Sequence, residues 1–459
     1  MLKNKKYSIS LFIFRRDLRL DDNTGLIKAL KFSEQVIPCF IFDPAQVDKK
    51  NSYRSLNCIQ FMFESLEDLN KQLITYGSKL YGFYGKPEVI VKNLINKYSI
   101  EAVFVNKDYT PFSIKRDKVI ENICLKNSVN FNSFSGILLV EPGKILNKNG
   151  EPYSIFSYFF KIASKNQINL PVENSYNNYF KKTLHNSISL EEVYKKILPK
   201  PNTYIWVKGG RGQSLKILKS ISNFKNYDKT KDYPDLSTTN LAAYLKFGTS
   251  SIREVYHAIY TNLGPYHTLI RQLFWRDFFT HIAYGSPFVF GHAFKFKYDS
   301  LKWSYNKEHF KAWQEGKTGF PIIDAGMRQL NQTGFIHNRV RMLVASFLVK
   351  DLHIDWRKGE KYFAQKLVDY DPSVNNGNWQ WCASTGTDSQ PYFRIFNPWL
   401  QQKKFDPKCE YIKKYVPELK SLEPRQIHNL YKINTQNYPR PLVDHLKEAK
   451  IAISYYKKF

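Results

Sequence analysis

The sequence predicts a doubly wound parallel α/β domain at the N-terminus, followed by a connector and an all-helical domain. Three observations support this prediction. Short apolar runs alternate with helical patterns in the first third of the chain. Residues 131–204 are irregular and rich in Asn, Lys, Ser and Pro. Beyond Gly209 and Gly210, helical periodicity dominates. We therefore expect domains over residues 1–130 and 205–459, joined by a connector over 131–204.

The alternation in the first domain is regular enough to place its elements in order. Apolar, β-rich runs that end in polar turns predict strands over residues 7–14, 35–42, 79–84 and 102–105. Helical spacing predicts helices over residues 25–32, 53–76, 88–97 and 112–125. No GxGxxG loop follows the first strand, which excludes an ordinary dinucleotide-binding domain. In the helical domain, one face of a predicted helix carries Ile336, Val340, Leu343 and Phe347.

The charge of the chain indicates a polyanionic partner. Its 459 residues include 69 Lys and Arg against 40 Asp and Glu, which gives a net charge of +29. Nucleic acid is the commonest partner of such a surface, and a membrane surface is the rival interpretation. The chain is 43% hydrophobic, enough for a large core, and its aromatic content of 16% is high.

The sequence gives no sign of membrane insertion or secretion. No run of about 18 apolar residues is present. Arg15 and Arg16 interrupt the apolar start of the chain, so this start is interpreted as a first strand and not as a signal peptide. The five cysteines have no metal-ligand spacing, and we expect neither a metal site nor disulfides. We expect an intracellular, soluble monomer of the cytoplasm or nucleus.

Several long motifs carry a family resemblance. The chain opens with FIFRRDLRLDDNTGL, and its helical half contains LFWRDFF, WQEGKTGFPIIDAGMRQL, HNRVRMLVASFLVKDLHIDWRKGE, DYDPSVNNGNWQW and STGTDSQPYFRIFNP. In this order they resemble the photolyase/cryptochrome family from end to end, most closely its class I cyclobutane pyrimidine dimer photolyases. The resemblance implies an N-terminal antenna domain and a helical domain that holds FAD.

The resemblance places FAD contacts at two parts of the helical domain. The first is Tyr227 with the phosphate-binding turn, whose matching residues are Thr238, Thr239, Asn240 and Leu241. Ala242 stands where many members have serine. The second part implies contacts from Arg341, Asp369, Asp371 and Asn375. Arg341 and Asp369 match an ion pair beside the isoalloxazine, where the charge of a reduced, anionic flavin must be offset.

Asn375 matches the residue that faces the flavin N5 atom. An amide can form a hydrogen bond there without titrating, which suits a reduced flavin. Plant cryptochromes usually have aspartate at this position and insect cryptochromes have cysteine, so the amide favours repair over signalling. Trp303, Trp356 and Trp379 match the triad that carries an electron from the surface to the excited flavin.

The resemblance also implies a pocket for a dimer flipped out of DNA. Its matching residues are Gln272, Trp275, Asn338, Met342 and Trp381. Two indole faces suit two pyrimidine rings, and the amide and thioether suit a neutral, polarisable pocket. The HNRVRM motif is similar to that of cyclobutane-dimer enzymes, whereas six–four photolyases carry paired histidines in this helix. Only His337 is present here.

Two positions depart from the pattern. Gln272 stands where bacterial cyclobutane-dimer photolyases usually have glutamate, and glutamine occurs there in six–four photolyases and many cryptochromes. Phe112 and Ser113 replace the Asn-Glu pair of folate-binding relatives, so a folate antenna is not indicated. A deazaflavin, a second flavin or no antenna chromophore are open alternatives.

The function implied is that of a deoxyribodipyrimidine photo-lyase. Such an enzyme binds DNA containing pyrimidine dimers and splits a cyclobutane dimer by electron transfer from photoexcited reduced FAD. A cryptochrome-type blue-light receptor without repair activity and a six–four photolyase are the alternatives. Asn375 and the HNRVRM helix favour the first function, and Gln272 favours the last.

Overall fold

The computed structural model describes residues 5–198, 200–433 and 435–459 and contains two compact units. Unit 1 comprises the described residues of 1–201, 207–225 and 239–287. Unit 2 comprises those of 202–206, 226–238 and 288–459. The expected fold class, a parallel α/β sheet domain and a helical domain, is confirmed. The expected domain boundaries at residues 130 and 204 stay predictions.

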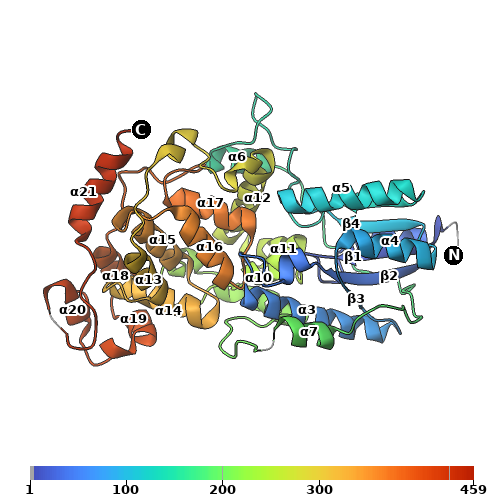
Figure 1. Ribbon diagram of the computed structural model, residues 1–459, viewed down its shortest axis with the longest axis horizontal. Coiled ribbons are helices and arrows are strands. Elements are labelled where there is room, and N and C mark those ends of the chain that lie inside the picture. Colours follow the sequence, from blue (N-terminus) through green and yellow to red (C-terminus); the bar gives the residue numbers. More distant parts are fainter. Residues whose placement is uncertain (1–4, 199, 434) are drawn as a thin grey trace. The chain divides into compact units, whose positions relative to one another are not determined.

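Unit 1 contains a five-stranded parallel sheet of order β3-β2-β1-β4-β5. The strands are β1 (Tyr7–Phe14), β2 (Ser33–Phe42), β3 (Tyr81–Tyr84), β4 (Ala102–Asn106) and β5 (Asn130–Phe134). In Figure 1, β4, β1, β2 and β3 lie one below the other in that order. The middle strands are almost wholly buried apolar runs, as expected for a parallel sheet covered by helices.

The edge strand β5 was not among the predicted strands. Its sequence, NFNSF, holds three polar residues of low β propensity, and all five residues are exposed or only half-buried. Its pairing with β4, from Ala102 opposite Asn130 to Asn106 opposite Phe134, defines it as a strand. The pairing with β4 therefore determines that β5 is a strand, and no hydrophobic pattern in its own sequence indicated this.

The crossover helices of the sheet lie near their predicted positions. They are α1 (Thr24–Phe32), α3 (Leu56–Thr75), α4 (Pro87–Tyr98) and α5 (Pro111–Lys126). Side chains cap the N-termini of α1 and α3, where Asn23 accepts from the Leu26 N–H and Ser55 accepts from the Cys58 N–H. Gly25 lets α1 approach β4 closely, because a Cβ there would lie 2.9 Å from Oδ1 of Asn106.

Unit 1 also contains further helices, and all but the first of them follow the sheet in sequence. They are α2 (Pro44–Val47), α6 (Phe156–Ala163), α7 (Leu190–Ile197), α8 (Arg211–Lys219), α10 (Ala242–Phe247), α11 (Ile252–Leu263) and α12 (Thr268–Gly285). The loop after β1 is joined to α11 by charge pairing, because Arg253 binds Asp22 at 2.7 Å and Asp22 is 1% exposed. This pairing groups α11 with the sheet.

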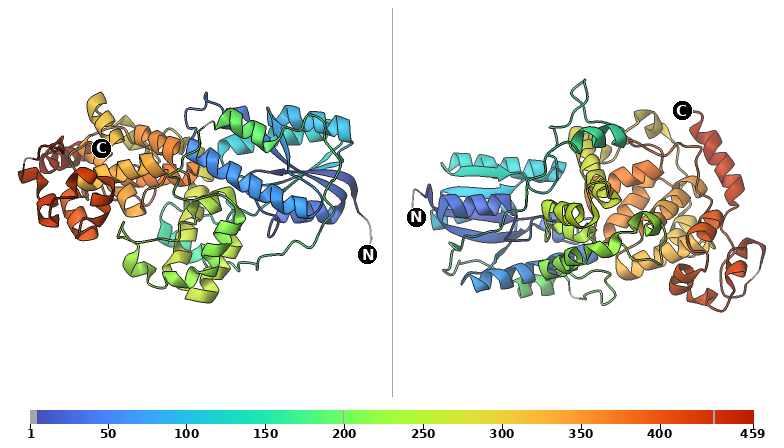
Figure 2. Two further views of the ribbon diagram at one scale, coloured as in Figure 1. Left: turned by 90° about the horizontal axis from the view of Figure 1, so that it is seen from below. Right: turned by 180° about the vertical axis from the view of Figure 1, so that it is seen from behind.

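Unit 2 is helical. Its helices are α9 (Tyr227–Thr230), α13 (Lys307–Glu315), α14 (Pro321–Thr333), α15 (Asn338–Ser346), α16 (Trp356–Lys366), α17 (Pro372–Cys382), α18 (Pro398–Phe405), α19 (Glu410–Tyr415), α20 (Pro424–Ile427) and α21 (His445–Tyr456). A π-helical turn, Phe347–Asp351, continues α15. Figure 2 shows the orange helices α13–α17 gathered in one bundle from two further sides. None of the described helices is long and apolar enough to cross a bilayer.

Candidate active site

Arg341 and Asp369 form the ion pair that the sequence predicts. Nη2 of Arg341 donates to Oδ2 of Asp369 at 2.9 Å, and Nε donates to the Ile336 carbonyl at 2.8 Å. The Asp369 side chain is only 6% exposed, and the Arg341 side chain is 25% exposed. Oδ1 of Asp369 is buried and has no hydrogen-bond partner among the described residues. A buried carboxylate oxygen without a donor fits a ligand that carries N–H groups, as a flavin does.

Asn375 lies on α17 with its amide held by a residue that the sequence analysis did not single out. Nδ2 of Asn375 donates to Oε1 of Glu360 at 2.8 Å and to the Glu360 carbonyl at 3.1 Å. Both side chains are buried, at 8% and 6% exposure. Since Glu360 takes both N–H bonds of the amide, Oδ1 of Asn375 is the atom available to a ligand. No local sequence signal marks Glu360, which lies on α16.

Asp371 caps the helix that carries Asn375. Its Oδ1 accepts from the N–H groups of Ser373 and Val374, at 3.1 and 3.4 Å, and Pro372 occupies the first helical position. Asp371 therefore has a structural role at the start of α17. A direct FAD contact from this residue stays a prediction.

The three tryptophans of the predicted triad share the core of unit 2. Trp379 and Trp356 are buried, at 2% and 1% exposure, and Trp303 packs partly exposed against the same core. Trp379 lies against α16 at Gly359, where an added Cβ would be 2.2 Å from the indole Cη2. The segment after Trp303 pairs with the segment before Trp356, since the Ser304 N–H donates to the His353 carbonyl at 2.8 Å. The three indoles thus lie in adjoining elements, from buried to partly exposed.

Three predicted lesion contacts belong to unit 2. Asn338 and Met342 lie one turn apart on α15, with Nδ2 of Asn338 3.8 Å from the Met342 sulfur. Asn338 is exposed, while Met342 and Trp381 are half-buried at the margin of the core. Cys382, which follows Trp381, lies 3.9 Å from the Met342 carbonyl, so these segments of α15 and α17 adjoin. An amide, a thioether and an indole are therefore accessible on neighbouring helices.

His337 caps α15 and is uncharged at neutral pH. Its Nδ1 accepts from the Arg339 N–H at 3.2 Å, and the side chain is 3% exposed. The pKa of His337 is lowered to about 4, mainly by burial; the nearby Asp232 raises it, and the guanidinium groups of Arg341 and Arg339 contribute to lowering it. An imidazole that stays neutral is a poor proton donor for acid–base catalysis.

The two remaining lesion contacts lie on α12 in unit 1. Gln272 is exposed and Trp275 is half-buried, although much of this helix is buried, including Phe274 and Phe278. Phe156 of α6 stacks on the Trp275 indole, with ring centroids 3.7 Å apart and planes 6° apart. The sequence analysis did not single out Phe156, because nothing local indicates its partner.

The predicted phosphate turn is divided between the two units. Tyr227 and Thr238 belong to unit 2, and Thr239, Asn240 and Leu241 belong to unit 1. Burial raises the pKa of Tyr227 to about 12, so its hydroxyl stays protonated. Asn240 adopts a left-handed conformation with φ of 54°, and Leu241 precedes α10. The role of these five residues in binding FAD stays a prediction.

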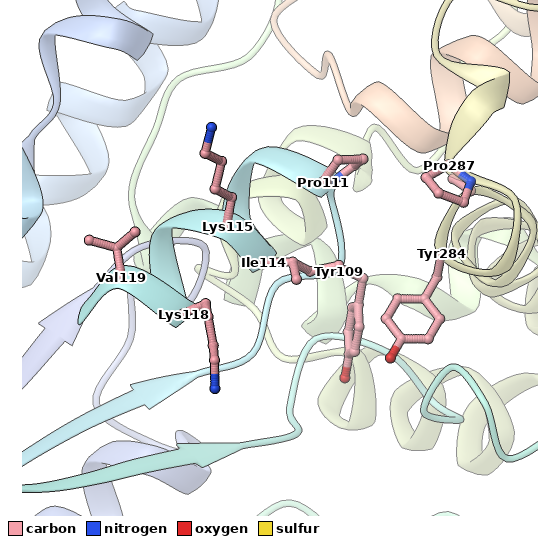
Figure 3. A pocket seen from close by; sticks show the side chains of 9 residues that line it. Tyr109, Pro111, Ile114, Lys115, Lys118, Val119, Tyr284 and Pro287 are labelled. Atoms are coloured by element: carbon pink, nitrogen blue, oxygen red, sulfur yellow. The ribbon is translucent and has the colours of Figure 1, made fainter. Parts of the chain in front are cut away.

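Unit 1 has a pocket of about 480 Å³ beside Phe112 and Ser113, the two positions at which folate-binding relatives have Asn and Glu. It is lined by Tyr109, Pro111, Ile114, Lys115, Lys118, Val119, Ala283, Tyr284 and Pro287. Figure 3 shows the rings of Tyr109 and Tyr284 side by side, and their centroids are 5.9 Å apart. Ser113 is buried and donates to Oδ2 of Asp108 at 2.9 Å, while Phe112 is exposed. The side chain at position 113 is therefore bound within the protein.

Comparisons with known proteins show the family to which the chain belongs. The DNA photolyase family model matches residues 10–175, and the model of the FAD-binding domain of DNA photolyase matches residues 269–458. A deoxyribodipyrimidine photo-lyase of Alkalihalophilus pseudofirmus is 34% identical, with 98% of each chain covered.

Two solved structures are similar along the whole chain. The archaeal photolyase from Sulfolobus tokodaii with two FAD molecules has a TM-score of 0.90 and 44% identity, covering 98% of this chain and 100% of that one. A class III photolyase from Agrobacterium tumefaciens has a TM-score of 0.91 and 32% identity, covering 100% and 99%. The expected family is therefore confirmed: the chain belongs to the DNA photolyase family and carries that family's FAD-binding domain.

Proposed function

We propose that this protein is a light-driven DNA-repair lyase that binds DNA containing a cyclobutane pyrimidine dimer, flips the dimer out and splits it. The observation that carries the proposal is the set formed by the half-buried Arg341 and the buried side chains of Asp369 and Asn375 within the matched FAD-binding domain. These groups offer three things to a buried ligand: one positive charge, one amide oxygen, and one carboxylate oxygen that accepts no hydrogen bond from the described residues. The net charge of +29 supports a DNA partner.

Arg341, Asp369 and Asn375 would hold the isoalloxazine, and Tyr227 with the 238–241 turn would hold the phosphates. When bound in its reduced, anionic form and excited by blue light, FAD supplies the electron that opens the two cyclobutane bonds and that returns after splitting. Arg341 offsets negative charge, Asp369 orients Arg341, and Asn375 presents a non-titrating acceptor because Glu360 fixes its amide. The reaction has no net redox change, so no second substrate is required.

We assign electron supply to Trp379, Trp356 and Trp303. Their order from buried to partly exposed supports a path from the core to the surface. Trp356→Phe should largely block light-driven reduction of oxidised holoprotein by an external reductant. Repair by holoprotein that was reduced chemically should survive, because the tryptophans are not on the repair path. Equal loss of both activities would contradict this assignment.

The cyclobutane dimer is proposed as the substrate because His337, the histidine of the α15 motif, is a poor proton donor. Six–four chemistry needs acid–base groups, and His337 is buried, caps α15 and has its pKa lowered to about 4. Asn338, Met342, Trp381 and Trp275 offer amide, thioether and indole contacts to a neutral dimer. Gln272 is the contrary residue, and we expect it to reduce the yield of repair.

Illumination of the reduced holoprotein with separate cyclobutane-dimer and six–four oligonucleotides tests this substrate. We expect loss of cyclobutane dimers only, and a higher yield per absorbed photon for Gln272→Glu at saturating DNA and fixed salt. Repair of six–four lesions alone would replace the proposed substrate. Repair of neither lesion, with normal photoreduction of the flavin, would favour the cryptochrome-type function.

We also propose a second FAD as the antenna chromophore. The archaeal relative described above contains two FAD molecules, and the folate pair is replaced here by Phe112 and Ser113. Release of the cofactors from the denatured, reconstituted protein should yield two FAD per chain and no folate. One FAD per chain would contradict the second site, and a folate would contradict the reading of positions 112 and 113.

A further inference from the structure

The indole of Trp275 is in contact with three aromatic rings, those of Phe156, Phe278 and Phe279. Phe156, the first residue of α6, is 1% exposed and stacks in parallel on the indole at 3.7 Å. Phe278 of the same helix as Trp275 meets the indole at 90°, with centroids 5.6 Å apart. Phe279, one turn further along the same helix, lies 5.6 Å from the indole with the ring planes 31° apart. Trp275 is only half-buried, so part of its side chain remains accessible to a ligand.

An arginine fastens α6 to α12 next to this stack. The Arg271 guanidinium carbon lies 4.9 Å from the ring centroids of both Phe156 and Phe160. Arg271 precedes Trp275 by one helical turn, so the two side chains emerge from the same side of α12. Phe156 thus contacts both a cation and an indole of one helix. Its ring is restrained by both, since a cation and an indole each attract an aromatic face.

We propose that Phe156 is a positioning residue that fixes the plane of the Trp275 indole, so that α6 takes part in recognition of the flipped dimer. A half-exposed indole without a stacking partner can rotate between rotamers, and a ligand would have to order it on binding. A pre-ordered indole face avoids this loss of entropy. The inference rests on the proposed function, because it requires Trp275 to contact the dimer.

The test measures the affinity of the FAD-loaded protein for one oligonucleotide with and without a cyclobutane dimer. Phe156→Leu keeps an apolar side chain but removes the flat ring, and Phe156→Tyr keeps the ring. Phe159→Leu is the matched control. Phe159 lies on the same helix, is also 1% exposed, and packs on Phe278 and His281. Among the described residues it has no ring contact with Trp275.

Phe156→Leu should weaken dimer binding about tenfold, the size expected for losing one ordered aromatic contact. Binding of undamaged DNA, FAD content and photoreduction should not change. Phe156→Tyr should stay within about twofold of the parent, and Phe159→Leu should keep the parent's preference for dimer DNA even if its melting temperature falls. Equal dimer binding by Phe156→Leu and Phe159→Leu would overturn the inference.

A fourth variant separates this inference from the proposed function. Trp275→Leu should remove most of the preference for dimer DNA. If Trp275→Leu loses this preference and Phe156→Leu keeps it, Trp275 recognises the dimer and the positioning role of Phe156 is wrong. If Trp275→Leu keeps it, the recognition assigned to Trp275 under the proposed function fails, and the role of Phe156 fails with it.

Discussion

The buried polar residues of unit 2 differ sharply from its lesion-contact residues. Asp369, Asn375 and Glu360 are nearly inaccessible and are joined by hydrogen bonds between 2.8 and 3.1 Å to partners on other elements. Asn338 is exposed, and within the described part of the chain its amide makes only a weak approach, at 3.8 Å, to the sulfur of Met342. The first group suits a resident cofactor, and the second suits a ligand that comes and goes.

This difference has a physical origin. A group that holds a permanent ligand must keep its orientation in a medium of low dielectric, so its remaining hydrogen bonds are satisfied by the protein. A group that binds a transient ligand must be reachable and loses little when it is free. Substitutions in the first group should therefore reduce stability, and substitutions in the second should change binding alone.

Arg341→Met should give the largest effect. It leaves the Asp369 carboxylate buried without its charge partner, and we expect a loss of about 3 kcal/mol in the free energy of unfolding together with loss of FAD. Urea unfolding and cofactor content measure both effects. Lys311→Met is the control, because its pair with Glu315 is 3.9 Å long and exposed, and it should cost at most about 0.5 kcal/mol. Similar losses for the two variants would contradict the comparison.

His337→Asn should reduce the fall in the free energy of unfolding as the pH is lowered. The pKa of His337 is lowered to about 4 in the folded protein, so between pH 6.5 and 4 the unfolded chain binds a proton that the folded chain does not. The wild type should lose up to about 3 kcal/mol from this group as the pH falls through that window. Asparagine keeps the cap on α15 and does not titrate. Urea unfolding from pH 7.5 to 4.5 measures the difference, and parallel profiles would refute it.

Gly359→Ala should disturb Trp379. The new Cβ would lie 2.2 Å from the indole, so the tryptophan or α16 must shift, at a cost of about 1–3 kcal/mol. Photoreduction of the flavin should slow as the indole moves. Gly212→Ala on α8 is the matched control, because nothing lies within 4 Å of its Cβ and it should be neutral or stabilising. Unchanged stability and photoreduction in Gly359→Ala would show that the contact is not restrictive.

Asn338→Ala should have the smallest effect on stability. An exposed side chain at the start of α15 should change the free energy of unfolding by no more than about 0.5 kcal/mol. Dimer affinity should fall about tenfold, as for the loss of one hydrogen bond to a ligand. Binding assays with and without the dimer measure this. A loss of stability without a loss of dimer preference would mean that Asn338 behaves like the buried residues Asp369 and Asn375. The proposed difference between cofactor-site and lesion-contact residues would then be wrong.

The sequence by itself determined the features that depend on residues close together in the chain, namely secondary structure and sequence motifs. Alternating apolar and helical patterns predicted four of the five strands and the crossover helices, because periodicity reports local burial. The long motifs predicted the family and the Arg341–Asp369 pair, which the structure contains. The strand β5 was not predicted, because its polar residues show no strand pattern and only its pairing with β4 defines it.

Only the tertiary structure decided the contacts between residues distant in sequence. The bond from Asn375 to Glu360, the stack of Phe156 on Trp275 and the fit of Gly359 against Trp379 each join two different elements. The lowered pKa of His337 has the same origin, since burial sets it. A local sequence pattern indicates which face of a helix is apolar, but it does not indicate which side chains pack against that face. Tertiary packing determines those partners, and it therefore also determines which titratable groups are buried and have shifted pKa values.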